Sequence, residues 1–145
     1  PDNWWKSDVY YNVTLDEFMF AIKNAIENGY SISIGGDVSE SGYSSTHDVA
    51  MVPSYDIPSQ FIDENARQFR FSNATTTDDH AIHLIGYKID ENEDWWFLIK
   101  DSGSGARNGK FPGYYFYHED FVKLKMMTFT IHKDAVKETL KKFNN

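Results

Sequence analysis

The sequence predicts an α+β domain in which one helix precedes a series of mostly antiparallel strands. The first observation is a single clear amphipathic helical pattern, close to the N-terminus. The second is a set of later segments that are apolar or alternating, rich in β-formers and separated by turn-forming residues. The third is the size and composition of the chain. Its 145 residues are the length of a single domain, and an aromatic content of 17% predicts a packed core. A helix followed by such strands is typical of the α+β class.

The helix is predicted to begin directly after Thr14. Thr14 and Glu17 have the spacing of a capping box, in which each side chain accepts a hydrogen bond from the other residue's backbone. Gly29 suits the left-handed residue that ends a helix. The apolar stripe between these ends recurs at helical spacing and is expected to pack in the core: Leu15, Phe18, Met19, Ile22, Ala25 and Ile26.

The remaining elements are predicted from alternation, apolar runs and breakers. A double glycine is expected to break the first strand. The segment 103–113, which follows the strand predicted for Trp95–Ile99, is glycine-rich and is expected to be flexible. The predicted strands are Tyr30–Ile34, His80–Tyr87, Trp95–Ile99, Tyr114–Tyr117 and Lys125–His132, the helical pieces are 60–71, 118–122 and 134–143, and the loops are 35–42, 43–51, 72–79 and 103–113.

Composition excludes several classes of function. The chain has 22 acidic and 14 basic residues, a net charge of −8, so it offers no basic stripe for a nucleic-acid partner. Its longest apolar run, Trp95–Ile99, is too short to cross a bilayer. The chain contains no cysteine, which rules out disulfides, thiolate metal sites and a cysteine nucleophile within these residues. No signal peptide is visible, and because the chain starts at Pro1 we expect a segment upstream of it.

Two predicted strands carry the candidate chemistry. His80 starts the first of them, and Asp101 follows the second, which is linked to the first by an acidic turn. In an antiparallel pair the start of one strand lies beside the end of the other, so His80 and Asp101 are expected to meet. A histidine oriented by a carboxylate is one half of a proton-transfer device. The spacing alone favours the plainer alternative, in which His80 caps a strand and Asp101 caps a turn.

Metal and serine chemistry are weaker alternatives. His80 and His83 point to opposite faces of a strand, so a shared metal ion would need distant ligands such as His47, Asp78 and Asp79. The Asp101–Gly105 segment contains serines but lacks the strand, Gly-x-Ser-x-Gly and helix context of an exposed nucleophile. No phosphate-binding loop is present. We therefore expect no cofactor and no metal.

A series of short motifs extends over nearly the whole chain. They are Trp4-Trp5 through Asn28-Gly29-Tyr30, Gly36-Asp37-Val38-Ser39-Glu40-Ser41-Gly42, Thr77-Asp78-Asp79-His80, His80-Ala81-Ile82 with Gly86-Tyr87, Trp96-Phe97-Leu98-Ile99-Lys100, Gly113-Tyr114-Tyr115, and Phe129-Thr130-Ile131-His132-Lys133-Asp134-Ala135. Together these motifs resemble the C-terminal half of papain-like cysteine peptidases, and most closely the aminopeptidase C / bleomycin hydrolase branch.

The resemblance implies a papain-like fold, of which residues 1–145 are the strand-rich, antiparallel β-barrel-like half with a preceding amphipathic helix. It implies that His80 is the catalytic base for a cysteine on the missing N-terminal half, and that Asp101 orients the imidazole. The family usually has Asn-Ser-Trp-Gly at this point, whereas this chain has Asp101-Ser102-Gly103. We expect Asp101 still to accept the imidazole N–H and to favour the imidazolium, and we expect the bond to be more exposed to water because Gly103 replaces the shielding tryptophan.

The predicted function is therefore that of a C-terminal fragment of a cysteine aminopeptidase, inactive without the other half. The resemblance further implies a peptide substrate, a cytoplasmic location with export left open, and a homo-hexamer. It also implies that the tail, 141–145, reaches toward the cleft and selects free N-termini. The alternative is a degenerate, non-catalytic binding or regulatory domain, which the altered Asp101–Gly103 motif suggests.

Overall fold

The structure is a computed structural model that describes residues 1–143. Its helices and strands follow in the order α1, β1, β2, β3, α2, β4, β5, β6, α3, β7 and α4, with four short 3₁₀ helices between or after them. The bounds are α1 Leu15–Glu27, β1 Ile32–Gly36, β2 Tyr43–Ser44, β3 Val49–Ala50, η1 Ser59–Phe61, α2 Glu64–Ser72, β4 His80–Ile89, β5 Trp95–Lys100, η2 Ser104–Arg107, β6 Tyr114–His118, α3 Glu119–Lys125, β7 Met126–Thr130, η3 Lys133–Val136, α4 Lys137–Leu140 and η4 Lys141–Phe143.

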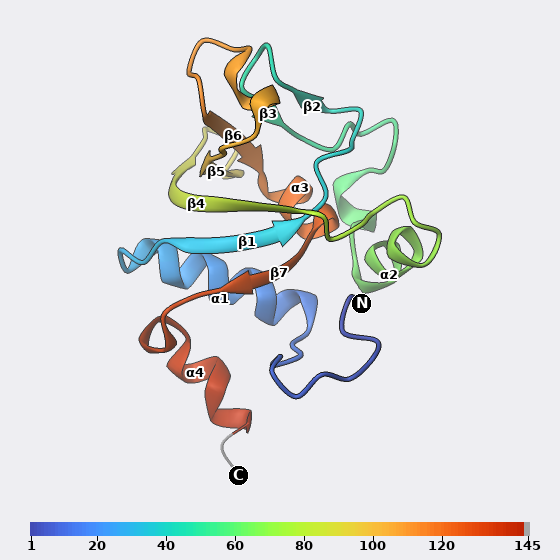
Figure 1. The fold of residues 1–145 in the computed structure, drawn as a ribbon, viewed down its shortest axis with the longest axis vertical. Coiled ribbons are helices and arrows are strands. Elements are labelled where there is room, and N and C mark those ends of the chain that lie inside the picture. Colours follow the sequence, from blue (N-terminus) through green and yellow to red (C-terminus); the bar gives the residue numbers. More distant parts are fainter. Residues whose placement is uncertain (144–145) are drawn as a thin grey trace.

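All seven strands join one sheet in the order β2-β3-β6-β5-β4-β1-β7. Every pair is antiparallel except β3 and β6, which are parallel. The predicted α+β class is confirmed. The predicted barrel-like closure is not seen in residues 1–143, because β2 and β7 each pair on one side only and leave the sheet open. β1 and β4 cross the middle of the molecule side by side (Figure 1).

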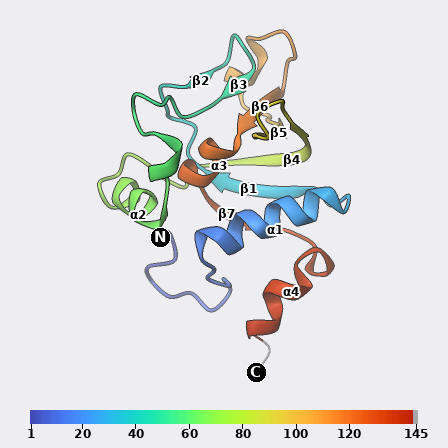
Figure 2. The same cartoon turned by 180° about the vertical axis from the view of Figure 1, so that it is seen from behind.

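Helix α1 lies along one face of the sheet, as both views show (Figures 1 and 2). Its capping box forms as predicted: Thr14 N–H donates to Glu17 Oε2 at 2.8 Å, and Glu17 N–H donates to Thr14 Oγ1 at 3.3 Å. Gly29 takes the left-handed conformation after the helix, with φ of +81°. The predicted apolar stripe is buried throughout, together with Ala21.

Strand β1 corrects the prediction made for its glycines. It begins at Ile32 and runs through Gly35 and Gly36, where a break was expected. A Cβ on Gly36 would stand 2.3 Å from Lys125 O, and one on Gly35 would stand 2.6 Å from Thr128 Oγ1. The two glycines therefore allow β1 to pack tightly against β7 and the end of α3, and they do not break the strand.

Four further predictions need adjustment. The polar loop 43–51 contains the short strands β2 and β3, and the glycine-rich segment 103–113 contains the 3₁₀ helix η2. The predicted terminal helix is divided into η3, α4 and η4. Lys125, predicted to begin the last strand, ends α3 instead, and β7 begins at Met126.

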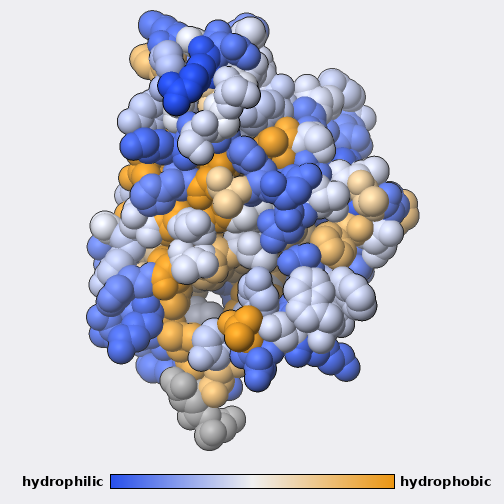
Figure 3. Space-filling view, in the orientation of Figure 1, coloured by the Kyte–Doolittle hydropathy of each residue, from blue (hydrophilic) through white to orange (hydrophobic). Residues whose placement is uncertain are grey.

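The surface of the molecule is mixed. The loop around η2, at the top of the space-filling view, is mainly hydrophilic, and apolar residues lie in patches farther down (Figure 3). None of the helices within residues 1–143 is both long and apolar enough to cross a membrane.

At the C-terminal end, Lys142 Nζ pairs with Glu17 Oε2 at 2.6 Å. The last two residues of the tail that was expected to reach the cleft, Asn144 and Asn145, lie outside the described residues.

Candidate active site

His80 and Asp101 lie in direct contact. His80 is the first residue of β4, and Asp101 follows the last residue of β5. The antiparallel register pairs His83 with Lys100, which places the start of β4 beside the end of β5. His80 Nε2 lies 2.9 Å from Asp101 Oδ2, which is an ordinary hydrogen-bond distance. The proximity predicted from the sequence is confirmed.

The carboxylate of Asp101 is held firmly on its other side. Oδ1 accepts a hydrogen bond from Gly103 N–H at 2.7 Å, and the Asp101 backbone N–H donates to Gly113 O at 2.9 Å. The Asp101 side chain is only 2% exposed, whereas that of His80 is 27% exposed. A buried, fixed carboxylate orients the imidazole through Nε2 and leaves Nδ1 as the ring nitrogen for a reacting group.

Gly103 leaves one side of this pair uncovered. A Cβ built on Gly103 would stand 3.2 Å from Asp101 Oδ1 and 3.5 Å from His80 Cε1. Its backbone, with φ of −57° and ψ of 148°, accepts any residue type. A large side chain at position 103 would therefore lie against the His80–Asp101 bond, whereas glycine leaves the partly exposed His80 ring without this cover and Asp101 stays buried.

Three tyrosines form the wall near Asp101. Tyr43 and Tyr115 stack with ring centroids 5.0 Å apart, and Tyr117 meets Tyr43 edge-on at 6.3 Å. Burial raises the pKa of each phenol, and the negative charge of Asp101 raises it further. The phenols therefore stay neutral at physiological pH, and the wall adds no second negative charge beside Asp101.

A buried lysine that the sequence analysis missed anchors the loop leading to His80. The side chain of Lys125 is fully buried. Its Nζ donates to Thr75 O at 2.8 Å and to Ser39 O at 3.2 Å, and lies 3.4 Å from Asp37 Oδ2. These contacts join the loop after β1, the loop before β4 and the end of α3. Its two neighbours in the sequence, Leu124 and Met126, are apolar, and this is the only signal in the sequence that could have marked Lys125 as buried.

Asp37 completes this anchor. It accepts hydrogen bonds from Ser39 N–H and Oγ, both at 2.5 Å, and from Thr77 N–H at 3.0 Å. Burial opposes ionisation of Asp37, but these hydrogen bonds and the Lys125 ammonium outweigh it and hold the pKa of Asp37 below its ordinary value. Because Thr77 is three residues before His80, the ionised Asp37 fixes the path of the chain into the site.

The residues considered as metal ligands lie apart. His47 Nδ1 contacts Ser44 Oγ at 2.8 Å, and Asp78 Oδ2 accepts from Thr128 Oγ1 at 3.1 Å. His83 lines a pocket, whereas His80 bonds to Asp101. Within residues 1–143 no group of three or more histidine, aspartate or glutamate side chains is placed to hold a metal ion.

No protein-family model and no curated protein matches this sequence. The fold is similar to the crystal structure of PepW from Lactobacillus rhamnosis HN001, with a TM-score of 0.65 and 15% sequence identity. The match covers 90% of this chain and 30% of the PepW chain, so the present chain spans less than a third of the length of PepW. At this identity the likeness shows the fold alone.

Proposed function

We propose that this chain is the C-terminal portion of a papain-like cysteine aminopeptidase. In this proposal His80 is the catalytic base and Asp101 orients it, and the nucleophilic cysteine belongs to a segment upstream of Pro1. The observation that carries the proposal is the 2.9 Å contact between His80 Nε2 and the buried Asp101 Oδ2, which leaves Nδ1 available. The similarity of the fold to PepW, which carries a peptidase name, supports it.

The chemistry follows from this arrangement. His80 Nδ1 accepts the proton of the cysteine thiol, and the thiolate attacks the carbonyl carbon of the peptide. When the C–N bond breaks, His80 returns the proton to the leaving amine, and a thioester to the cysteine remains. His80 then removes a proton from water, which attacks the thioester and releases the acid while the thiol is protonated again. Asp101 stabilises the imidazolium that forms twice in this cycle.

The test is kinetic and uses the full-length parent protein. His80→Ala is expected to reduce the release of amino acids from peptides by about a thousandfold or more, because removing the base of a catalytic unit costs this much. The matched control is His47→Ala, since His47 is exposed and contacts only neighbouring hydroxyl groups. Turnover near the normal rate in the His80 variant, with equal folding of both variants, would contradict the proposal.

A second candidate is a degenerate peptidase that binds without catalysis. The observation that favours it is the uncovered His80–Asp101 pair, since Gly103 provides no shielding side chain. The two candidates differ in one feature of the parent, namely a Gln…Cys-Trp segment upstream of Pro1. Under the enzyme proposal, a peptidyl electrophile labels one thiol of the native parent, and this labelling is lost in His80→Ala. An unlabelled parent would support the binding domain.

The remaining expectations are part of the same proposal. A peptide substrate, selection of free N-termini by the chain's own tail, hexameric assembly and a cytoplasmic location all follow from the family resemblance and stay predictions. The oligomer is checked by the mass of the native parent in solution. The role of the tail is checked by deleting residues 141–145 from the parent, which should open the cleft to longer substrates and convert amino-acid release into endopeptidase cleavage.

A further inference from the structure

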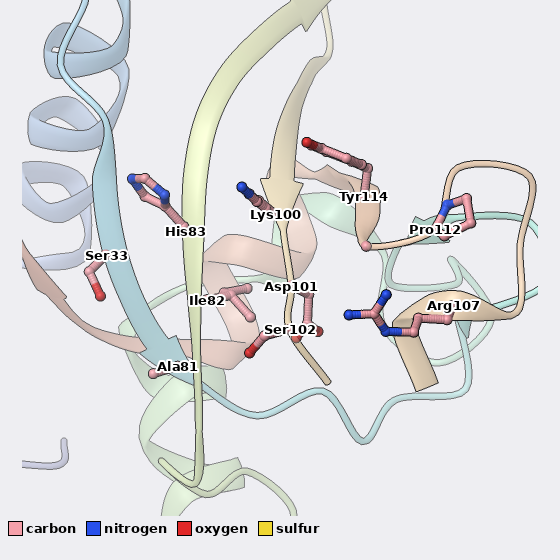
Figure 4. A pocket seen from close by; sticks show the side chains of 11 residues that line it. Ser33, Ala81, Ile82, His83, Lys100, Asp101, Ser102, Arg107, Pro112 and Tyr114 are labelled. Carbon is pink, nitrogen blue, oxygen red and sulfur yellow. The ribbon is translucent and has the colours of Figure 1, made fainter. Parts of the chain in front are cut away.

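An open pocket of about 750 Å³ lies beside Asp101 on the exposed face of the sheet (Figure 4). Its floor is one cross-strand row, because Ser33 pairs with His83, His83 with Lys100, and Lys100 with Tyr114. Arg107 reaches into the pocket from η2, with its guanidinium directed toward the end of β5 (Figure 4). The volume is in the range of small-ligand sites.

The charge of the pocket is opposite to the charge of the chain. The chain as a whole carries −8, yet the titratable groups that face this pocket are three basic side chains, one carboxylate and one phenol: His83, Lys100, Arg107, Asp101 and Tyr114. Asp101 is 5% exposed and already contacts His80. Across residues 1–143, no ion pair involves His83, Lys100 or Arg107. Lys100 and Arg107 are therefore positive groups that the described part of the fold leaves unneutralised, and His83 adds a third positive charge only when it is protonated.

The clustering of these basic side chains does not stabilise the fold. His83 stands directly opposite Lys100 in the antiparallel pair, and two like charges in that position destabilise a sheet whenever the histidine is protonated. Arg107 adds a further positive charge to the same space. An anion bound among the three groups would remove this repulsion and would gain charge-assisted hydrogen bonds from lysine and arginine.

We propose that this pocket is a binding subsite for the carboxylate of an acidic peptide side chain. Lys100 and Arg107 provide the charged donors, and Tyr114, the cross-strand partner of Lys100, lines the same pocket. Pro112 and the ring of Tyr114 offer apolar surface to the methylene groups that carry such a carboxylate. A peptide suits the pocket better than a polyanion, because the net charge of −8 repels an extended negative ligand. That the peptide is a substrate rests on the proposed function, whereas the binding itself does not.

The experiment is an NMR titration of the 145-residue chain at low salt with two peptides that differ in one group. N-acetyl-Gly-Glu-Gly-amide carries the carboxylate, and N-acetyl-Gly-Gln-Gly-amide is its neutral match. The glutamate peptide is expected to shift the amide signals of His83, Lys100 and Tyr114 and to bind about tenfold more tightly than the glutamine peptide, which is the effect of one good charged contact. Lys100→Gln and Arg107→Gln should each remove about that preference.

The control variant is Lys110→Gln, an exposed lysine in the same loop that does not line the pocket. It should leave the preference unchanged. Equal affinity for the two peptides, or an equal loss in the Lys110 and Arg107 variants, would overturn the subsite and leave only general electrostatic attraction. Inorganic phosphate that binds as tightly as the glutamate peptide would overturn the assignment to a peptide carboxylate.

A second arm repeats the titration with the full-length parent. Binding to the isolated chain but not to the parent would assign the pocket to an acidic segment of the parent itself and would overturn the substrate assignment. No thiol takes part in any of these measurements. A failed titration therefore leaves His80 as the proposed base, and an unaffected His80→Ala parent leaves the pocket as a carboxylate site.

Discussion

His80 Nε2 and Asp101 Oδ2 are 2.9 Å apart although 21 positions separate the two residues in the chain. The contact depends on the register of β4 and β5, which shifts between Leu84 and Gly86. It also depends on Gly103 and Gly113, whose backbone groups hold Asp101 in place. The His80–Asp101 pair is thus a product of one hairpin and of the turn that follows it.

Removing the Asp101 carboxylate should loosen the imidazole and the turn together. Asp101→Ala leaves His80 Nε2 and Gly103 N–H without a partner, and we expect a loss of about 1–3 kcal/mol in the free energy of unfolding. Asp101→Asn keeps one carbonyl acceptor and should lose less. Urea unfolding measures the loss, and the low-field imidazole N–H resonance of His80 should be absent in the alanine variant. A resonance unchanged in Asp101→Ala would contradict the contact.

Covering the pair should protect it from water. In Gly103→Trp the new side chain starts 3.2 Å from Asp101 Oδ1, so its indole is expected to shield the bond and slow the exchange of the His80 imidazole N–H with solvent. Gly105→Trp is the matched control, because a Cβ there meets nothing within 4 Å. Exchange at the same rate in both variants would show that Gly103 is not the opening.

Replacing Lys125 by methionine should destabilise the fold strongly. The change leaves Asp37 buried without its positive partner, and breaking a buried ion pair costs about 3–5 kcal/mol. Lys137→Met is the control: this lysine also pairs with an aspartate, Asp134, but its side chain is 68% exposed. A surface pair of this kind contributes about 1 kcal/mol or less. Similar unfolding curves for the two variants would be incompatible with the anchoring role of Lys125.

The stability of the folded chain should depend on pH through the ionisation of Asp37. Its pKa is lowered in the folded state, so ionised Asp37 stabilises the fold above the ordinary aspartate value of about 3.9, and this contribution is lost as the pH falls through the lowered folded pKa. We therefore expect Asp37→Asn to be less stable than the native chain at pH 7. This difference in the free energy of unfolding between the variant and the native chain should narrow as the pH drops below about 4. Urea midpoints measured from pH 7 to pH 2 test this, and a gap that widens in acid would have the wrong sign.

The capping box of α1 should contribute to stability in the usual way. Thr14→Ala removes the acceptor of the Glu17 N–H and is expected to cost about 0.5–2 kcal/mol. Thr14→Ser keeps the hydroxyl group and should cost much less. Thermal unfolding of the two variants provides the comparison, and equal losses would show that the methyl group, and not the hydrogen bond, matters.

Helix α1 and the hairpin of β4 and β5 could be predicted because their determinants are local. A capping box, a 3.6-residue apolar stripe and a terminal glycine act within the helix itself. The hairpin follows from two β-rich segments joined by a short acidic turn, and the meeting of His80 with Asp101 follows from the hairpin. Sequence patterns report such features well because the interacting residues are near one another in the chain.

The double glycine, the buried lysine and the charged pocket were decided by tertiary structure. The sequence predicted that Gly35 and Gly36 end the first strand. They lie inside β1 instead, because β7 and the end of α3 approach so closely that no side chain fits there. Lys125 was predicted to begin a strand. It ends α3 instead, and its ammonium can be buried because carbonyls and Asp37 from distant loops surround it. The row of His83 and Lys100 depends on a register that includes a bulge. In each case the deciding partner is brought close only by the packing of the whole chain, and no local pattern specifies it.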